Sequence, residues 1–209
     1  MMATRIQNPL LPQHPYAMQV SGPSACGKTV WVKDLLTHKD SPLDNIFYYY
    51  SVWQPLYEEM QAVLGDTITF IEGLPEETPL FDNALTTCFI FDDLMEEVNK
   101  SPWASKLYTA GCHHQNLRVL GLQQRIFTNR DQRLQCHYLC VFDYVADRGA
   151  IEPLARQLCP GKVEDFRQMY RDATAPNHGW FLIDLKKDRD PRLRFRRGWR
   201  DCYIDNAEL

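Results

Sequence analysis

The chain has 209 residues, of which 44% are hydrophobic and 24% charged, so it has enough apolar material for the core of one α/β domain. No run of eighteen apolar residues and no signal-peptide pattern occurs, and seven cysteines include no C-x-x-C pair, so we expect neither a membrane-spanning nor a secreted, disulfide-bonded protein. Residues 1–100 carry 5 Lys/Arg against 14 Asp/Glu, and residues 101–209 carry 18 Lys/Arg against 13 Asp/Glu. Either the basic second half contacts a polyanion, or these charges only keep the surface solvated.

The first half of the chain alternates strand-like and helix-like segments. Residues 1–15 are polar, contain three prolines and are expected to form an arm, whereas residues 16–209 are expected to form one domain. The apolar strand Ala17–Ser21 runs directly into Gly22, and a helix follows over Val30–Leu36. Further strands are expected at Ile46–Tyr50 and Thr67–Ile71, separated by a turn at residues 53–55 and a helix to residue 64.

The second half continues this alternation. Cys88–Phe91 is wholly apolar, as expected of a buried parallel strand, and ends at Asp92-Asp93. After a helical stretch to about residue 111, the expected elements are strands at Leu117–Leu122 and Tyr138–Phe142, helices at Ala150–Leu158 and Val163–Ala173, and a hairpin of Trp180–Leu185 with Leu193–Arg197. This order predicts an α/β fold, with a mostly parallel sheet between helix layers and a C-terminal β-hairpin.

A complete phosphate-binding motif follows the first strand. The segment reads Gly22-Pro23-Ser24-Ala25-Cys26-Gly27-Lys28-Thr29 and matches G-x-x-x-x-G-K-[ST] at every fixed position. Its glycines allow backbone N–H groups to surround phosphates, and the following helix adds its positive N-terminal end. We expect Lys28 to reach the β- and γ-phosphates and the Thr29 hydroxyl to bind Mg²⁺. Because Cys26 lies inside this loop, we also expect free thiols and a reducing compartment.

Two further strand ends supply polar groups suited to nucleotide hydrolysis. Asp92 fits the carboxylate that holds Mg²⁺, and Asp93 fits the group that orients the attacking water, unless it only caps the next helix. Gln124, or its neighbour Gln123, follows the strand Leu117–Leu122 and fits a sensor of the γ-phosphate; a plain polar strand end is the alternative. A strand ending in Gln after the Asp-Asp strand is typical of ATPases with an additional strand between the phosphate loop and the metal carboxylate.

Two other clusters are open to more than one interpretation. Cys112, His113 and His114, with the later Cys136, His137 and Cys140, match no standard zinc spacing, so we expect no zinc site. Arg192, Arg194 and Arg196 alternate with Leu193 and Phe195 along a predicted strand, and this arginine row either faces DNA phosphates or is the solvated face of an edge strand.

Several runs of the sequence resemble viral genome-packaging ATPases of the FtsK–HerA superfamily, the poxvirus type with its short Polinton-like and adintovirus-like versions. The resemblance spans about residues 5–185 and rests on residues 20–28, the turn at 50–55, FIEGLP at 70–75, FDDLMEEV at 91–98, GCHHQNLRVLGLQQRIF at 111–127 and LARQLCPGK at 154–162. The family pattern usually ends its sensor strand in Thr-Gln, so Gln124 matches and Gln123 departs from it.

The resemblance implies a P-loop three-layer α/β/α ATPase with an additional strand between the Walker A and Walker B strands. It implies a homo-oligomeric ring of five or six subunits that uses ATP and Mg²⁺ to translocate double-stranded DNA into a procapsid, in the host nucleus or cytoplasm or associated with the virion. Each site in such a ring is completed by an arginine of the next subunit, for which Arg130, Arg133 and Arg148 are the candidates.

Three other functions stay open. A DNA-dependent helicase or segregation pump has the same fold, and a nucleotide-binding assembly protein with slow hydrolysis needs the same loop. A small-molecule P-loop kinase is less favoured because no Arg-rich lid is visible. A GTPase is not supported, because residues 99–102 read Asn-Lys-Ser-Pro and lack the Asp of the guanine motif.

Overall fold

The computed structural model describes residues 10–38, 42–108, 112, 116–126 and 135–203. The described end of the N-terminal segment packs against the domain. Leu11 is buried, the backbone N–H of Gln13 donates a hydrogen bond to the Tyr138 hydroxyl at 3.0 Å, and the Lys186 ammonium donates to the Gln13 carbonyl at 2.7 Å. Residues 10–15 therefore contact the central and C-terminal strands.

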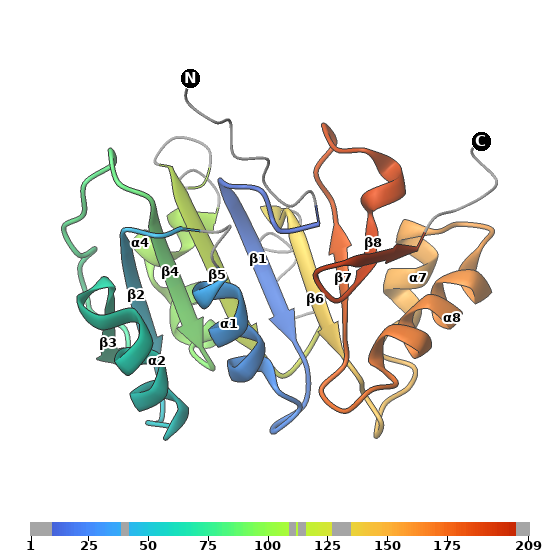
Figure 1. Cartoon of the computed structure of the whole chain (residues 1–209), viewed down its shortest axis with the longest axis horizontal. Coiled ribbons are helices and arrows are strands. Elements are labelled where there is room, and N and C mark those ends of the chain that lie inside the picture. The colour runs from blue at the N-terminus through green and yellow to red at the C-terminus, as the bar shows by residue number, and fades with distance from the viewer. Residues whose placement is uncertain (1–9, 39–41, 109–111, 113–115, 127–134, 204–209) are drawn as a thin grey trace.

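The strands of the described residues form one sheet in the order β3-β2-β4-β5-β1-β6-β7-β8-β9 (Figure 1). Neighbours from β3 to β6 are parallel, and β7, β8 and β9 are added antiparallel. The predicted mostly parallel α/β fold with a C-terminal hairpin is thus confirmed. In chain order the strands are β1 (Tyr16–Ser21), β2 (Asn45–Tyr50), β3 (Ile68–Glu72), β4 (Thr87–Asp92), β5 (Leu117–Gln123), β6 (Tyr138–Phe142), β7 (Trp180–Asp184), β8 (Phe195–Arg197) and β9 (Asp201–Tyr203).

An additional strand does lie between the phosphate loop and the metal carboxylate, but it is β5 and not the strands near residues 46 and 67, which were expected to intervene. It pairs with β1 on one side, where Val20 lies opposite Leu122, and with β4 on the other, where Asp92 lies opposite the same Leu122. The strands near residues 46 and 68, β2 and β3, lie on the far side of β4 from β5, and β3 is the outermost strand. Because β1, β5 and β4 are parallel, the loop after β1 and the carboxylate at the end of β4 both lie at the carboxyl-terminal ends of these strands. They are two strands apart.

Helices cover both faces of the sheet. One face packs against α1 and α2, and the other against α3 and α4 beside β4 and β5, and against α7 and α8 beside β6 and β7 (Figure 1). Strand alternation sorts the apolar side chains into these layers: Met18 and Val20 of β1 face α1, whereas Ala17 faces the α3–α4 side. The helices are α1 (Lys28–Thr37), α2 (Leu56–Leu64), α3 (Met95–Lys100), α4 (Pro102–Lys106), α7 (Glu152–Leu158) and α8 (Val163–Thr174), with 3₁₀ turns at Gly65–Thr67 and Pro191–Leu193.

The C-terminal hairpin differs from the prediction in detail. The predicted strand Leu193–Arg197 begins only at Phe195, because Pro191 and the carboxylate of Asp190, which accepts from the Arg192 N–H at 3.0 Å, set up a 3₁₀ turn first. A ninth strand, β9, was not predicted; its three residues are too few to show a period in the sequence.

Candidate nucleotide-binding site

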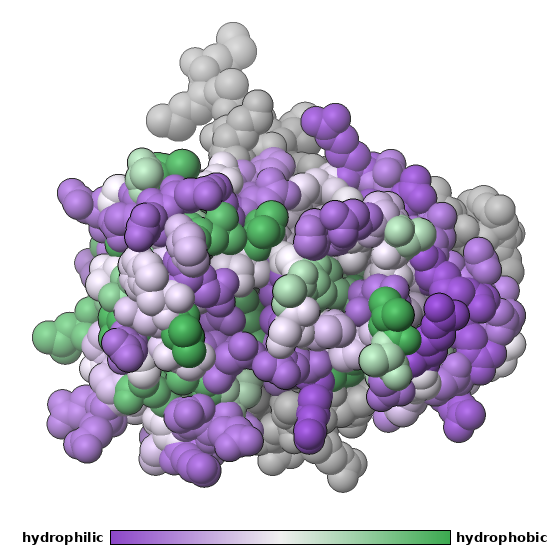
Figure 2. Space-filling view, turned by 90° about the horizontal axis from the view of Figure 1, so that it is seen from below, coloured by the Kyte–Doolittle hydropathy of each residue, from purple (hydrophilic) through white to green (hydrophobic). Residues whose placement is uncertain are grey.

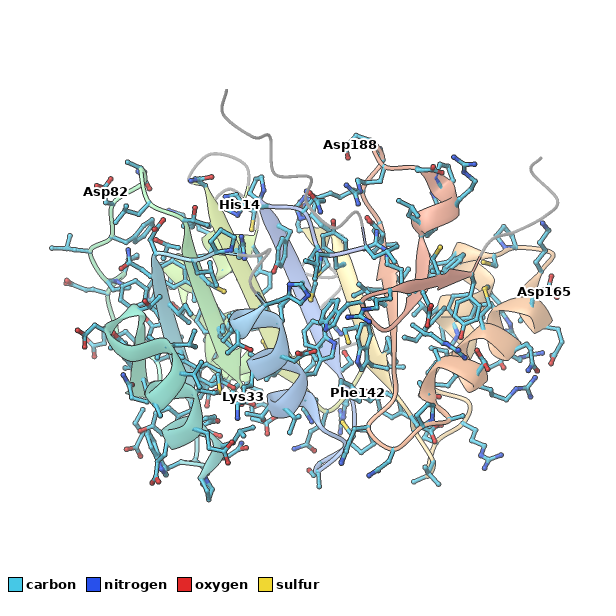
Figure 3. The ribbon with its side chains drawn as sticks, viewed as in Figure 1. His14, Lys33, Asp82, Phe142, Asp165 and Asp188 are labelled. Atoms are coloured by element: carbon cyan, nitrogen blue, oxygen red, sulfur yellow. The ribbon has the colours of Figure 1, made fainter. Side chains whose placement is uncertain are left out.

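The phosphate loop lies between β1 and α1, as the motif predicts. Ala25 and Gly27 have φ of 61° and 108°, so left-handed residues alternate with others and form the concave backbone that binds anions. Gly22 is required for space, because a Cβ there would lie 2.5 Å from the Cys26 Sγ and 2.7 Å from the Cβ of Phe142, at the end of β6 (Figure 3). The loop is therefore shaped for phosphate by its own backbone.

Lys28 and Thr29 begin α1 at the mouth of this loop. The Lys28 ammonium is buried and donates hydrogen bonds to the carbonyls of Gly22 and Pro23 at 2.8 and 2.9 Å. The Thr29 hydroxyl donates to Gln54 Oε1 at 3.3 Å, from the turn between β2 and α2. A cation inside the loop and a hydroxyl beside it are the groups that a nucleotide phosphate and its metal need.

Asp92 ends β4 with its carboxylate buried against α2. The hydroxyls of Tyr48 and Tyr57 both donate to Asp92 Oδ2, at 2.7 and 3.0 Å. Burial raises the pKa of this carboxyl above its ordinary value, while the two tyrosine hydrogen bonds and the nearby Lys28 act in the opposite direction. The tyrosines thus fix one carboxylate oxygen and favour the ionised form that a metal requires.

Asp93 is exposed and adopts a left-handed conformation with φ of 55°. Its backbone N–H donates to the Leu122 carbonyl at 3.2 Å, which ties it to β5. The alternative role as a helix cap is not supported, because α3 has Leu94 at its N-cap and no side-chain hydrogen bond there. A strained backbone at an exposed carboxylate beside the loop suits a functional residue.

The two glutamines after β5 occupy different environments. Gln123 is the last residue of β5 and is buried; alternation places it on the face opposite Leu122 and Asp92. Gln124 is exposed, and its carbonyl accepts a hydrogen bond from the Tyr144 hydroxyl at 2.8 Å. The backbone of Gln124 is therefore held by Tyr144, and Gln124 is exposed just after the end of β5.

Of the three candidate arginines, only Arg148 lies within the described residues; Arg130 and Arg133 fall outside them. Arg148 is exposed in the turn after β6, at the same sheet edge as the phosphate loop. It is thus available to contact another molecule.

The arginine row predicted near residues 192–196 does not exist as one surface. Arg196 is fully buried, where its guanidinium pairs with Asp184 and donates to the Leu10 carbonyl at 2.8 Å. Arg192 lies outside the strand and pairs with Asp190 at 2.8 Å. The predicted row is therefore divided, because Arg196 is turned into the protein around Asp184 whereas Arg192 stays exposed outside the strand.

The loop before β7 adds a histidine that contacts the phosphate loop. His178 Nδ1 lies 3.0 Å from the Cys26 carbonyl, and a Cβ at Gly27 would lie 2.9 Å from the same nitrogen. The imidazole therefore packs directly on the loop backbone. Gly27 is required there both for its φ and for this close approach.

Viewed from the edge at which the parallel strands end, the surface is a mixture of hydrophilic and small hydrophobic areas, with hydrophilic residues gathered on the side of α7 and α8 (Figure 2). Within the described ranges no group of three His, Cys, Asp or Glu side chains can hold a metal ion, and no helix there is long and apolar enough to cross a membrane. His113 and His114 lie outside those ranges. All seven cysteines are free, and four are buried.

Solved structures share the fold of this chain, although no family model and no curated sequence matches it. B204, the DNA-packaging ATPase of Sulfolobus turreted icosahedral virus, matches with a TM-score of 0.59 at 11% identity, over 83% of this chain and 94% of B204. The chain has the fold of a viral genome-packaging ATPase. The B204 NTPase of Sulfolobus turreted icosahedral virus 2 in complex with ATPγS matches with a TM-score of 0.55 at 11% identity, over 82% and 93% of the two chains.

A secretion ATPase shares the same fold. The cytoplasmic domain of the type VII secretion ATPase EccC of Thermomonospora curvata matches with a TM-score of 0.54 at 13% identity, over 87% of this chain but 25% of EccC. The expected likeness to the packaging ATPases is confirmed at the level of the fold.

Within this packaging-ATPase fold, the sequence predicted the loop and carboxylates but missed the groups that contact them. None of Tyr48, Gln54, Tyr57 and His178 was predicted from the sequence to belong to the site. These contacts depend on the sheet order and not on local sequence. Tyr48 is 44 residues from Asp92, and His178 is 152 residues from Cys26.

Proposed function

We propose that this chain is an ATP-hydrolysing translocase that packages double-stranded viral DNA into a procapsid. The observation that carries the proposal is the meeting of the phosphate loop, Asp92 and the end of β5 at one sheet edge, within a fold shared with B204 over 94% of that chain. The match to EccC covers only 25% of that protein, so we favour a packaging motor over a secretion motor.

The loop residues Gly22, Pro23, Ser24, Ala25, Cys26 and Gly27 bind the phosphates of ATP through backbone N–H groups, and Lys28 exchanges its bonds to loop carbonyls for the β- and γ-phosphates. The hydroxyl of Thr29 and the carboxylate of Asp92 are hard oxygen donors and fit Mg²⁺, which would neutralise charge on the phosphates. With a single protein carboxylate, this site depends on the nucleotide to complete the coordination.

Asp93 orients the attacking water, and Gln124 senses the γ-phosphate. The exposed, backbone-held position of Gln124 supports this choice over Gln123, which alternation turns away from Asp92. Arg148 reaches the site of the neighbouring subunit in a homo-oligomeric ring of five or six copies and stabilises charge on the transferred phosphoryl group. Sequence-independent contacts to DNA phosphates suffice for such a motor.

The test is ATP hydrolysis by the purified protein with and without long double-stranded DNA, at several protein concentrations. We expect DNA to stimulate hydrolysis and the rate to rise more steeply than linearly with protein, because each site needs its neighbour. Hydrolysis that ignores DNA and is linear in protein would favour a monomeric kinase-like enzyme. A nucleotide-dependent ring without turnover on DNA would favour the assembly protein.

A further inference from the structure

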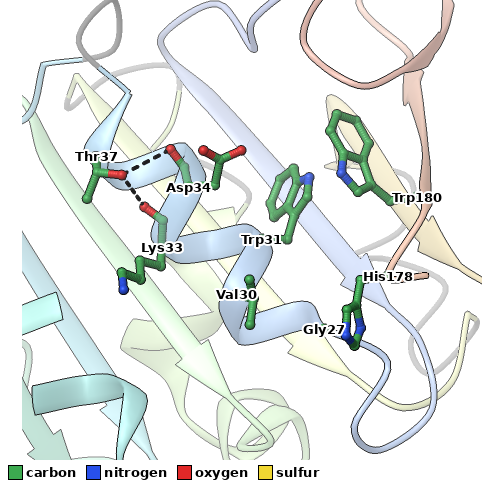
Figure 4. A pocket seen from close by; sticks show the side chains of 8 residues that line it. All are labelled: Gly27, Val30, Trp31, Lys33, Asp34, Thr37, His178 and Trp180. Carbon is green, nitrogen blue, oxygen red and sulfur yellow. Dashed lines mark hydrogen bonds between the residues drawn. The ribbon is translucent and has the colours of Figure 1, made fainter. Parts of the chain in front are cut away.

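A pocket of about 400 Å³ opens beside the phosphate loop on the outer side of α1 (Figure 4). It begins at Gly27 and follows successive turns of α1, where Val30, Asp34 and Thr37 share one side of the helix. His178, from the loop before β7, and Trp180, the first residue of β7, form the opposite wall. None of the proposed catalytic side chains lines this pocket.

The pocket lies on the side of β1 where the nucleoside end of a bound nucleotide is expected. The metal carboxylate and sensor strand, β4 and β5, lie on one side of β1, so the γ-phosphate end is expected there. The pocket lies on the other side, towards β6 and β7. From Thr29 to Asp34 α1 rises about 7.5 Å, which is the scale of a ribose and a base.

The lining has the chemistry of a base site. His178, Trp180 and Trp31 contribute flat rings, and Val30 adds an apolar side chain that is 53% exposed. Trp31 is almost completely buried, and its indole N–H finds no hydrogen-bond acceptor among the described residues. The base of a nucleotide is a planar ring that bears acceptor nitrogens. Such a ring suits this mostly apolar pocket wall, which has the unsatisfied indole N–H of Trp31 beneath it.

We propose that this pocket binds the base of the nucleoside triphosphate and that the imidazole of His178 is the ring on which the base stacks. The proposal rests on the proposed function, because it assigns the base end of the nucleotide held by the phosphate loop. His178 is suited to the role because its Nδ1 contact with Cys26 and its packing on Gly27 hold the imidazole at the entrance of the pocket.

The test compares the binding of the non-hydrolysable ATP analogue AMPPNP and of inorganic tripolyphosphate, both with Mg²⁺, by calorimetry. Replacing His178→Ala is expected to weaken AMPPNP about tenfold, as loss of one stacked ring does, and to leave tripolyphosphate within about twofold. His178→Phe keeps a ring and is expected to retain AMPPNP affinity. Asn177→Ala, an exposed neighbour in the same loop, is the control and is expected to change neither.

Each other outcome is decisive. Equal weakening of both ligands by His178→Ala would show that His178 acts only on the loop backbone and would overturn the proposal, as would no change with either. Failure of the unaltered protein to bind either ligand would instead overturn the proposed function. Thermal unfolding of each variant verifies that it is folded.

A second experiment locates the base directly. Photolysis of 8-azido-ATP bound to the full chain, followed by peptide mapping, is expected to label residues 30–37 or 175–180. The competing aromatic surface is the turn that carries Trp53, 47% exposed beside Tyr50 and Tyr57 on the β2 side of the sheet. Labelling of that turn would overturn the proposal.

Discussion

The hydroxyl of Tyr57 donates a hydrogen bond to Asp92 Oδ2 at 3.0 Å, and this contact joins α2 to the strand that carries the metal carboxylate. Three residues earlier in the chain, Gln54 accepts a bond from the Thr29 hydroxyl at 3.3 Å. The turn before α2 and the first turn of α2 therefore touch both proposed Mg²⁺ ligands. This arrangement makes α2 the element that positions the metal-binding groups.

Replacing Tyr57→Phe is expected to raise the Mg²⁺ concentration needed for half-maximal hydrolysis by about tenfold, because Asp92 loses a bond that orients it. The measurement is ATPase rate against Mg²⁺ concentration. Tyr49→Phe is the matched control: its buried hydroxyl has no hydrogen-bond partner within the described part of the chain, so no change is expected. An unchanged Mg²⁺ dependence in Tyr57→Phe would contradict a positioning role.

Replacing Asp93→Asn is expected to leave nucleotide affinity intact and to reduce turnover by at least about a hundredfold, because the amide is a poor acceptor for the proton of the attacking water. Lys28→Ala is expected to abolish tight binding instead. Calorimetry with AMPPNP and single-turnover hydrolysis separate the two effects. Normal hydrolysis by Asp93→Asn would remove the assigned role.

Replacing Arg196→Met is expected to destabilise the protein by about 3 kcal/mol, because the buried Asp184 carboxylate then keeps only the more distant Arg189, at 3.6 Å, as an ionic partner. Arg192→Met removes an exposed ion pair and is expected to cost less than about 1 kcal/mol. Urea unfolding followed by tryptophan fluorescence measures both. Equal, small effects would show that the buried pair contributes little, and a loss of DNA binding in folded Arg192→Met would restore a role for that arginine on DNA.

The alkaline pH dependence of stability follows from the buried thiols. Burial raises the pKa of Cys136 from 9.0 to about 12, so between these values the unfolded chain loses the proton while the folded chain keeps it. The free energy of unfolding therefore falls as pH rises from 9 to 12, by about 1.4 kcal/mol per pH unit for this thiol. Cys136→Ala is expected to make that fall shallower by this amount; an unchanged slope in urea unfolding would contradict the assignment.

What the sequence could predict depended on whether the relevant contact is local. The phosphate loop needs only eight consecutive residues, and the strand carrying Asp92 is marked by its apolar run, so both were placed correctly. The strand that carries Tyr48 was predicted, but not the contact of Tyr48 with Asp92, which requires the β2–β4 pairing. For Arg196, the alternation with Phe195 along the strand was predicted correctly. Its burial was not predicted, because the sequence does not show that Arg196 pairs with Asp184.

The pocket beside α1 was also beyond sequence analysis, since its walls come from residues 27–37 and 178–180. Sheet order brings β7 next to β6, and β6 next to β1, so the loop before β7 reaches the phosphate loop. A single sequence carries no signal for that adjacency.

The central claim is that ATP hydrolysis moves this protein along duplex DNA, and displacement of a triplex-forming oligonucleotide from a linear duplex tests it most directly. The account predicts ATP-dependent displacement by the unaltered protein, none by Asp93→Asn, and no separation of the strands of a forked duplex. Hydrolysis stimulated by DNA without displacement of the third strand, or unwinding of the fork, would contradict it.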